Sequence, residues 1–164
     1  MIKKNKITKV LIAFLVFLQW NAIGQNERPY SIGKTYKIHS KILKEERNYI
    51  LELPSSYETS KNNYPILVLL DGEVNYHSHS GILKHMTDGR QIPEMIIVAI
   101  TNVDRVRDFT PTKYLTNLNG SSAVENHKTS GGSSRFLNFI EEELLPEIRS
   151  PPSSVGWSGI RVSS

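Results

Sequence analysis

Hydrophobic residues in this chain gather in two continuous runs, one at residues 66–70 and one at residues 95–100. No polar residue interrupts either run. A short aliphatic run without polar alternation is typical of a strand that is buried on both faces, as in the middle of a parallel sheet. Pro65 fits the beginning of the first strand, because a first residue need not donate to the hydrogen-bond ladder. The pattern therefore predicts two buried strands.

Two stretches before these runs alternate between apolar and polar residues instead. Residues 36–42 and 48–53 each place large apolar side chains at every second position, which is typical of a half-buried strand. The charged residues 44–47 are expected to form the turn between them, and Pro54 is expected to end the second strand. We expect an antiparallel hairpin here.

A short helix is expected between the two apolar runs, at residues 81–86, with Ile82, Leu83 and Met86 on one side. Two buried strands separated by a helical segment are typical of a βαβ unit, in which the two strands are parallel. The pattern of the central part of the chain thus favours an α/β fold.

A longer amphipathic helix is expected at residues 136–148, with Glu141, Glu142 and Glu143 opposite its apolar face. Ser133 or Ser134 is expected as its N-cap, and Pro146 is expected to kink or end it near the last turn. We expect the apolar face to pack into the core rather than bind a partner; it consists of Phe136, Leu137, Phe139, Ile140, Leu144, Leu145 and Ile148.

Residues 101–132 contain many Asn, Thr, Ser and Gly residues and are expected to be irregular. A connection of this length within a compact domain is usually functional or disordered.

The amino terminus has the composition of a secretory signal peptide. Four lysines precede the apolar segment 10–18, and small residues follow at positions 22 and 24. This predicts a signal peptide at residues 1–24, cleavage before Gln25, and an exported product in the periplasm or outside the cell. A retained anchor is the alternative, although the apolar segment is short for a membrane-spanning helix. Residues 25–35 are expected to be a mobile segment that leads into the domain.

Charge and cysteine content narrow the possible partners. The chain has 164 residues, enough for one domain, and a formal net charge of +4. Residues 1–24 hold four of the 20 basic residues and none of the 16 acidic ones, so the remaining chain is formally neutral. A neutral domain gives no electrostatic reason to expect nucleic acid or an anionic membrane as a partner. The absence of cysteine excludes disulfides and a lipid-modified N-terminal Cys.

The first candidate for chemistry is the turn Asp71-Gly72, which follows the predicted strand 66–70. Ligands of open α/β sheets bind at the carboxyl ends of the strands. A glycine turn with free backbone N–H groups at such an end is suited to an anion or an oxyanion. An ordinary strand-to-loop turn is the alternative interpretation.

The order of these elements resembles the amino-terminal half of an α/β-hydrolase. More specifically, residues 36–148 resemble the Putative esterase family, which includes esterase D, enterochelin esterase and related feruloyl esterases. The fold class implied is α/β, as a partial α/β-hydrolase fold with an amino-terminal hairpin, parallel strands and helices. The segments that carry the resemblance are 51–57, 64–73, 95–100, 102–112 and 136–148.

The resemblance implies an exported serine carboxylic-ester hydrolase that acts on a small-molecule ester and needs no cofactor. It implies that the backbone N–H of Glu73, after Asp71 and Gly72, is an oxyanion-hole donor. It also implies that the loop 105–112 borders the active-site cleft. Arg105 or Arg107 is then expected to meet an anionic or polar part of the substrate. The alternative is that Arg107 and Asp108 only hold the loop in place, and Asp108 is kept as a cleft candidate beside them.

The family pattern requires a further strand, a G-x-S-x-G nucleophile elbow, an acid and a histidine. Residues 149–164 are instead expected to be an irregular tail outside the family pattern. Within it, Gly156-Trp157-Ser158-Gly159-Ile160 departs from the elbow at its fifth position. We therefore expect a truncated or frame-shifted chain that lacks nucleophile, acid and histidine and is inactive alone. A small non-catalytic exported binding module is the alternative.

His77 and His79 raise the question of a metal site, since a His-x-His pair on a strand can bind zinc. Here the pair is expected in a loop and has no third ligand at a fixed spacing, so no metal site is predicted. No role is assigned to His39, His85 or His127.

Overall fold

The computed structural model describes residues 32–150, apart from 115, 117–120 and 122–126, together with Arg161. Contacts divide the chain into residues 1–31 and 32–164, and the description below concerns the second unit. The predicted signal peptide, the start of the segment 25–35 and Ser158 lie outside the described residues.

The described strands form one mixed sheet of four strands in the order β1-β2-β4-β3. These strands are β1 (Lys34–Ser40), β2 (Glu45–Glu52), β3 (Ile66–Leu69) and β4 (Ile96–Ile100). β2 pairs antiparallel with both β1 and β4, whereas β3 and β4 are parallel. The predicted hairpin and the predicted pair of parallel strands are therefore both confirmed.

The position of the first apolar run in the sheet differs from the prediction. β3 is an edge strand of the four-stranded sheet, all four of its residues are partly exposed, and the following Leu70 is 38% exposed. The central parallel strand is β4, all five residues of which are buried. An apolar run identifies a strand, but which strands flank it is decided by the tertiary structure, because the neighbours come from distant parts of the chain.

The hairpin also turns earlier than predicted. Residues 41–44 form the turn, and Lys44 adopts a positive φ of 60°. The charged residues 45–47 belong to β2, where Glu45 pairs with Ser40 and Arg47 pairs with Ile38.

The helix between β3 and β4 is longer than predicted. α2 runs from Gly72 to Asp88, whereas residues 81–86 were expected. Its buried residues, Gly72, Tyr76 and Ser80, follow one another at intervals of four, but one alone of the three is hydrophobic. The hydrophobic pattern therefore could not predict the first half of α2. Ile82, expected on one side of this helix together with Leu83 and Met86, is 58% exposed.

Part of the region 101–132 is also helical. α3 spans Arg105–Phe109, and the Asp104 side chain caps it by accepting a hydrogen bond from the Arg107 N–H. An Asp whose side chain accepts a hydrogen bond from the N–H three residues later is a common N-cap arrangement.

The last helix has three parts: α4 (Ser133–Asn138), the π-helical η2 (Phe139–Leu144) and α5 (Leu145–Arg149). Its N-cap is Gly132, not Ser133 or Ser134. Pro146 does not end the helix. A proline lacks the N–H and crowds the carbonyl four residues earlier, and the π-helical turn directly before it provides a wider local hydrogen-bond spacing. Of the predicted apolar face, Leu137 is 55% exposed.

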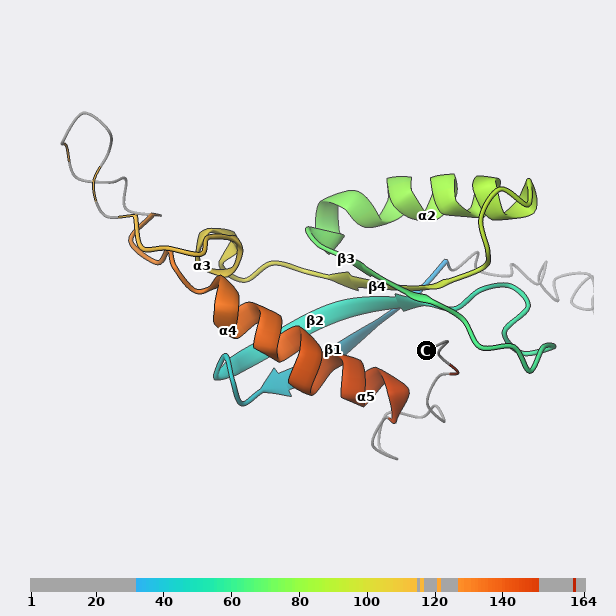
Figure 1. The fold of residues 1–164 in the computed structure, drawn as a ribbon, viewed down its shortest axis with the longest axis horizontal. Helices are drawn as coiled ribbons and strands as arrows, with labels where there is room; N and C mark the ends of the chain where they lie inside the picture. The colour runs from blue at the N-terminus through green and yellow to red at the C-terminus, as the bar shows by residue number, and fades with distance from the viewer. Residues whose placement is uncertain (1–31, 115, 117–120, 122–126, 151–160, 162–164) are drawn as a thin grey trace, which may run out of the picture. The chain divides into compact units, whose positions relative to one another are not determined.

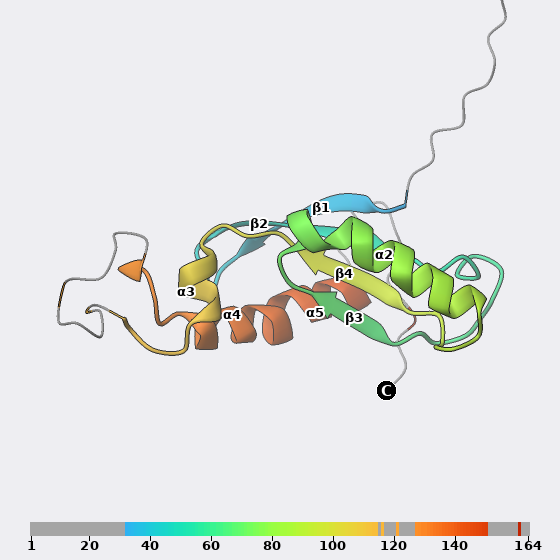
Figure 2. The same ribbon diagram turned by 90° about the horizontal axis from the view of Figure 1, so that it is seen from above.

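The helices cover opposite faces of the sheet. Figure 1 shows α2 on one face and the α4–α5 helix on the other, and Figure 2 shows α2 lying over β3 and β4. The larger core packs Tyr49, Val98 and Ile100 against Phe136 and Phe139, with other buried residues. The smaller core joins Tyr76 to Ile97 and Ala99. Within the described ranges, no helix is both long enough and apolar enough to cross a membrane.

Candidate active site

The turn Asp71-Gly72-Glu73 lies at the carboxyl end of β3, beside the carboxyl end of β4, to which β3 is parallel. Asp71 is in the left-handed region, with φ 53° and ψ 46°, and is the N-cap of α2. This conformation costs a residue with a side chain about 1–2 kcal/mol, although Asp tolerates it better than most residues. One left-handed residue therefore converts strand β3 directly into helix α2.

Gly72 permits the close approach of α2 to β4. A Cβ atom on Gly72 would lie 2.9 Å from the carbonyl carbon of Ala99 and 2.9 Å from the carbonyl oxygen of Ile100. These are backbone atoms of a buried central strand, which cannot easily move aside. The position therefore requires glycine, and it fixes the helix start against the strand end.

Asn102, just after β4, holds the turn from the other side. Its Nδ2 donates to Asp71 Oδ1 at 2.7 Å and to Glu73 Oε1 at 2.6 Å, and its backbone N–H donates to Glu73 Oε2 at 3.1 Å. Arg105 of α3 adds an ion pair, with Nε 2.9 Å from Asp71 Oδ1. The hydrogen bond from Arg105, with the one from Asn102, holds the pKa of Asp71 below its ordinary value.

The first N–H groups of α2 differ in their hydrogen bonds. The N–H groups of Val74 and Asn75 both donate to the Asp71 carbonyl, at 3.0 and 2.9 Å. Those of Gly72 and Glu73 have no acceptor among the residues that the structure describes. The first N–H groups of a helix lack intrahelical partners and carry partial positive charge. The turn can therefore present backbone donors to a negatively charged oxygen.

The three predicted cleft residues separate into two groups. Arg105 joins the turn, and its side chain is 63% exposed. Arg107 and Asp108 belong to a cluster of ion pairs that ties α3 to β2. Arg107 contacts Glu45 at 2.6 Å and Asp108 at 2.8 Å, and the buried Arg47 contacts both of these carboxylates. This arrangement matches the alternative in which Arg107 and Asp108 hold the segment in place.

Burial and charge act against each other in this cluster. Burial alone would raise the pKa of Glu45, but the hydrogen bond from Arg107 and the charges of Arg47 and Arg107 together lower it. The pKa of Arg107 is raised by its hydrogen bonds to Glu45 and Asp108. Both shifts favour the ionised forms of Glu45 and Arg107, and the ion pairs of the cluster join α3 to β2.

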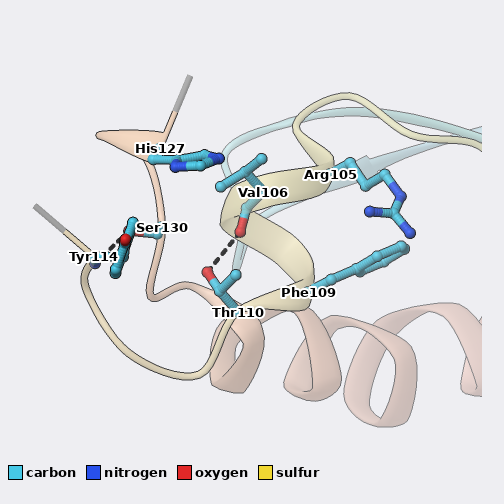
Figure 3. A pocket seen from close by; sticks show the side chains of 7 residues that line it. All are labelled: Arg105, Val106, Phe109, Thr110, Tyr114, His127 and Ser130. Atoms are coloured by element: carbon cyan, nitrogen blue, oxygen red, sulfur yellow. Dashed lines mark hydrogen bonds between the residues drawn. The ribbon is translucent and has the colours of Figure 1, made fainter. Parts of the chain in front are cut away.

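A pocket of about 400 Å³ adjoins the other side of α3. Among its lining residues, Figure 3 shows Arg105 and Phe109 on one side of α3 and Tyr114, His127 and Ser130 on the other. Val106 and Thr110, the remaining lining residues, lie between the two sides. Arg105 thus belongs both to the pocket and to the network around Asp71.

His77 and His79 are on helix α2, not in a loop. Residues two apart on a helix do not face each other, and no group of three potential metal ligands occurs among the described residues. His39 lies on β1, 2.7 Å from Glu46, and His85 is in the last turn of α2.

Sequence reasoning missed two parts of this site. Asn102 was part of a matching segment without a role, and Tyr114, His127 and Ser130 were unassigned. The sequence did carry one signal for α3: Asp104 stands before a short amphipathic segment, which is a pattern typical of a helix start. The pairing of Asn102 with Asp71 had no local signal, since the two residues are 31 positions apart.

The fold and the turn define a class of protein, an α/β protein with the architecture of part of an esterase. The family model described as "Putative esterase" matches residues 40–160, and the chain belongs to that family. The match extends beyond the resemblance expected from the sequence, which ended at residue 148.

Similar proteins include an IroE-like serine hydrolase from Shewanella oneidensis, of known crystal structure. It is 37% identical, with a TM-score of 0.70, over 79% of this chain and 39% of that protein. The enterobactin esterase FES from Shigella flexneri is 21% identical, with a TM-score of 0.51, over 77% of this chain and 28% of that one, and supports the fold alone. The "Uncharacterized protein YbbA" of Bacillus subtilis (strain 168) is 24% identical over 119 residues. The matched part is 69% of this chain and 46% of YbbA, so this chain spans less than half the length of each of these relatives.

Proposed function

We propose that this chain carries the oxyanion-binding side of an exported serine carboxylic-ester hydrolase that acts on a small-molecule ester. The observation that supports this most directly is the turn at the carboxyl end of β3, whose Glu73 N–H has no acceptor in the described part of the chain. A backbone donor held rigidly in this way stabilises the negative charge that develops on an ester carbonyl oxygen during attack.

The surrounding residues give the donor its rigidity. Gly72 sets α2 directly against β4, and Asn102 ties Glu73 to Asp71. A preorganised donor costs no reorganisation at the moment of reaction. Residues 71–73 are thus proposed as the binding turn, with Asn102 and Arg105 as positioning residues.

The second part of the proposal concerns the nucleophile. The pattern G-x-S-x-G does not occur in the 164 residues, and Ser158 stands in the altered form Gly156-Trp157-Ser158-Gly159-Ile160. The elbow pattern serves to expose the serine hydroxyl on a tight strand-to-helix turn. We expect this chain by itself not to hydrolyse esters, and we expect residues 1–24 to be removed on export.

Two measurements test these parts separately. Hydrolysis of p-nitrophenyl butyrate is compared for the wild-type chain and Ser158→Ala, and no turnover above the buffer rate is expected from either. A wild-type rate that Ser158→Ala abolishes shows that the nucleophile is present and contradicts the second part of the proposal.

The donor is tested by binding acetate, the simplest carboxylate product, followed through amide resonances in NMR spectra. We expect a saturable shift at the Glu73 amide and at the neighbouring amides of Gly72 and Val74, and these two neighbours report on the variants at position 73. Glu73→Pro removes the N–H at a first-turn position where proline is tolerated, and it should abolish the shift. Glu73→Gln keeps the N–H and is the matched control. An equal response in both variants excludes the oxyanion-binding role and leaves a binding module of another kind.

A further inference from the structure

Arg161 contacts the loop that leads into β3. Its guanidinium donates hydrogen bonds to three backbone carbonyls of this loop, from Nε to Asn62 at 3.2 Å and from Nη2 to Ser60 at 2.8 Å and to Tyr57. The guanidinium carbon also lies over the Tyr57 ring, 4.4 Å from its centroid. The Arg161 carbonyl accepts a hydrogen bond from the Tyr64 N–H at 3.0 Å. We call the three carbonyls and the Tyr57 ring the guanidinium socket.

The loop has hydrogen bonds of its own that shape this socket. The Tyr57 N–H donates to the Pro54 carbonyl at 3.0 Å, and the Ser60 N–H donates to the Ser56 carbonyl at 2.8 Å. The Asn62 N–H donates to Ser60 Oγ at 2.9 Å. Each residue that supplies a carbonyl to the socket is therefore held through its own N–H. A site that is ordered before its ligand arrives loses little conformational freedom on binding.

A second network fixes the aromatic part of the socket. Glu94 accepts hydrogen bonds from Ser55 Oγ at 2.9 Å and from the Ser56 N–H at 3.3 Å. Ser56 Oγ lies 2.7 Å from the Tyr64 hydroxyl oxygen, and the Tyr64 and Tyr57 ring centroids are 5.7 Å apart. Both tyrosines are buried. The face of the Tyr57 ring that the guanidinium covers is therefore held in place.

The chemistry of the socket selects a flat cation with several donors. Backbone carbonyls only accept hydrogen bonds, so a ligand has to donate to all three. A guanidinium presents five N–H groups in a planar fork and stacks on aromatic faces. A cation within about 6 Å of a ring centroid is attracted to the ring face. A primary ammonium has its donors on one strongly hydrated atom and no flat face, so it fits this socket less well.

We propose that the loop 57–64 is a binding site for an arginine side chain, which the chain's own Arg161 occupies. When Arg161 is removed, the socket keeps its shape and binds an alkylguanidinium from solution. The socket lies before the amino end of β3, whereas the turn 71–73 follows the carboxyl end of that strand. The inference is therefore independent of the proposed function.

The first experiment empties the socket and refills it. Arg161→Ala should lower the midpoint of thermal unfolding by about 5 °C or more, because it removes three charge-assisted hydrogen bonds. Ethylguanidinium at about 20 mM should restore about half of this loss, and ethylammonium at the same concentration should not. Arg135→Ala, at an exposed position of α4, is the matched control. It should shift the midpoint by less than about 3 °C and respond to neither probe.

NMR spectra locate the site. Ethylguanidinium added to Arg161→Ala should shift the amide resonances of residues 57–64 saturably. The same addition to the wild-type chain should leave them unchanged, because Arg161 fills the socket. A further measurement needs no loss of Arg161. Its Nε–H proton should resonate upfield of those of other arginines, since the guanidinium lies over the Tyr57 ring, and Tyr57→Leu should remove this displacement.

Several results would overturn the inference. One is an Arg161→Ala chain that ethylguanidinium neither stabilises nor shifts at residues 57–64. Equal stabilisation by ethylammonium, or equal shifts in the wild-type chain, would reject a socket that is specific for guanidinium and filled by Arg161. If Arg161→Ala does not fold, the wild-type Nε–H proton decides, and a resonance that Tyr57→Leu leaves in place rejects the site.

Discussion

Asn102 Nδ2 lies 2.7 Å from Asp71 Oδ1, so a residue two positions beyond the end of β4 holds a residue two positions beyond the end of the parallel strand β3. The same amide nitrogen reaches Glu73 at 2.6 Å, and one side chain therefore fixes both ends of the turn. Asp71 follows β3 and Asn102 follows β4, so both residues lie at the same edge of the sheet. The geometry of the proposed oxyanion donor depends on this connection.

Asn102→Ala should destabilise the fold by about 1–3 kcal/mol, because it leaves two carboxylates without their amide donor. Urea denaturation measures the change. Val74→Ala is the control, since Val74 is 74% exposed and its truncation should change stability by less than about 0.5 kcal/mol. Equal stability of Asn102→Ala and wild type would show that the network does not hold the turn.

Gly72→Ala and Gly81→Ala should have opposite effects, although both lie in α2. A Cβ at position 72 meets the β4 backbone at 2.9 Å and should cost about 1–3 kcal/mol by overpacking. A Cβ at position 81 meets nothing within 4 Å and should stabilise the helix by about 0.5–1 kcal/mol. Thermal unfolding compares the two. A Gly72→Ala protein as stable as Gly81→Ala would contradict the close approach of α2 to β4.

Acid should weaken the turn through Asp71. The Arg105 hydrogen bond lowers the folded-state pKa of Asp71 below the unfolded value of about 3.9. The stabilisation is therefore complete above the unfolded pKa and is lost as the pH falls through the lower, folded pKa. An NMR titration of the Asp71 carboxyl carbon should show a midpoint below 3.9, and Arg105→Gln should raise it. If Arg105→Gln leaves the midpoint unchanged, the hydrogen bond from Arg105 is not what lowers the pKa of Asp71.

Removing one partner of the buried pair Arg47–Asp108 should be far more damaging than removing Arg107. Both side chains of the pair are 1% exposed, and Asp108→Asn leaves the buried Arg47 with the Glu45 carboxylate alone of the two that it contacts, so the change should cost about 3 kcal/mol. Arg107→Met should cost less, because Glu45, with a side chain 20% exposed, can be rehydrated and Asp108 keeps its pair with Arg47. Chemical denaturation ranks the two variants. The reverse order would argue for Arg107 as the main anchor of α3.

The hydrophobic pattern predicted most of the regular elements. Residues 96–100 and 66–69 form the expected parallel strands, and the alternating stretches form the hairpin, because side-chain periodicity directly reflects strand burial. The pattern did not predict the first half of α2, because its buried positions are filled by Gly72, Tyr76 and Ser80. Glycine and serine carry no hydrophobic signal, even where packing requires small residues.

By itself the sequence determined the α/β class, the family resemblance and the turn that ends β3, because each depends on residues close together in the chain. The tertiary structure alone decided that β3 is an edge strand of the described sheet, that Asn102 joins Asp71 to Glu73, and that Arg107 and Asp108 pair with β2. It also brought Arg105 and His127 to one pocket. Arg105 and His127 are 22 positions apart, and Asn102 and Glu73 are 29 positions apart. No local pattern in the sequence encodes which of such distant side chains will meet.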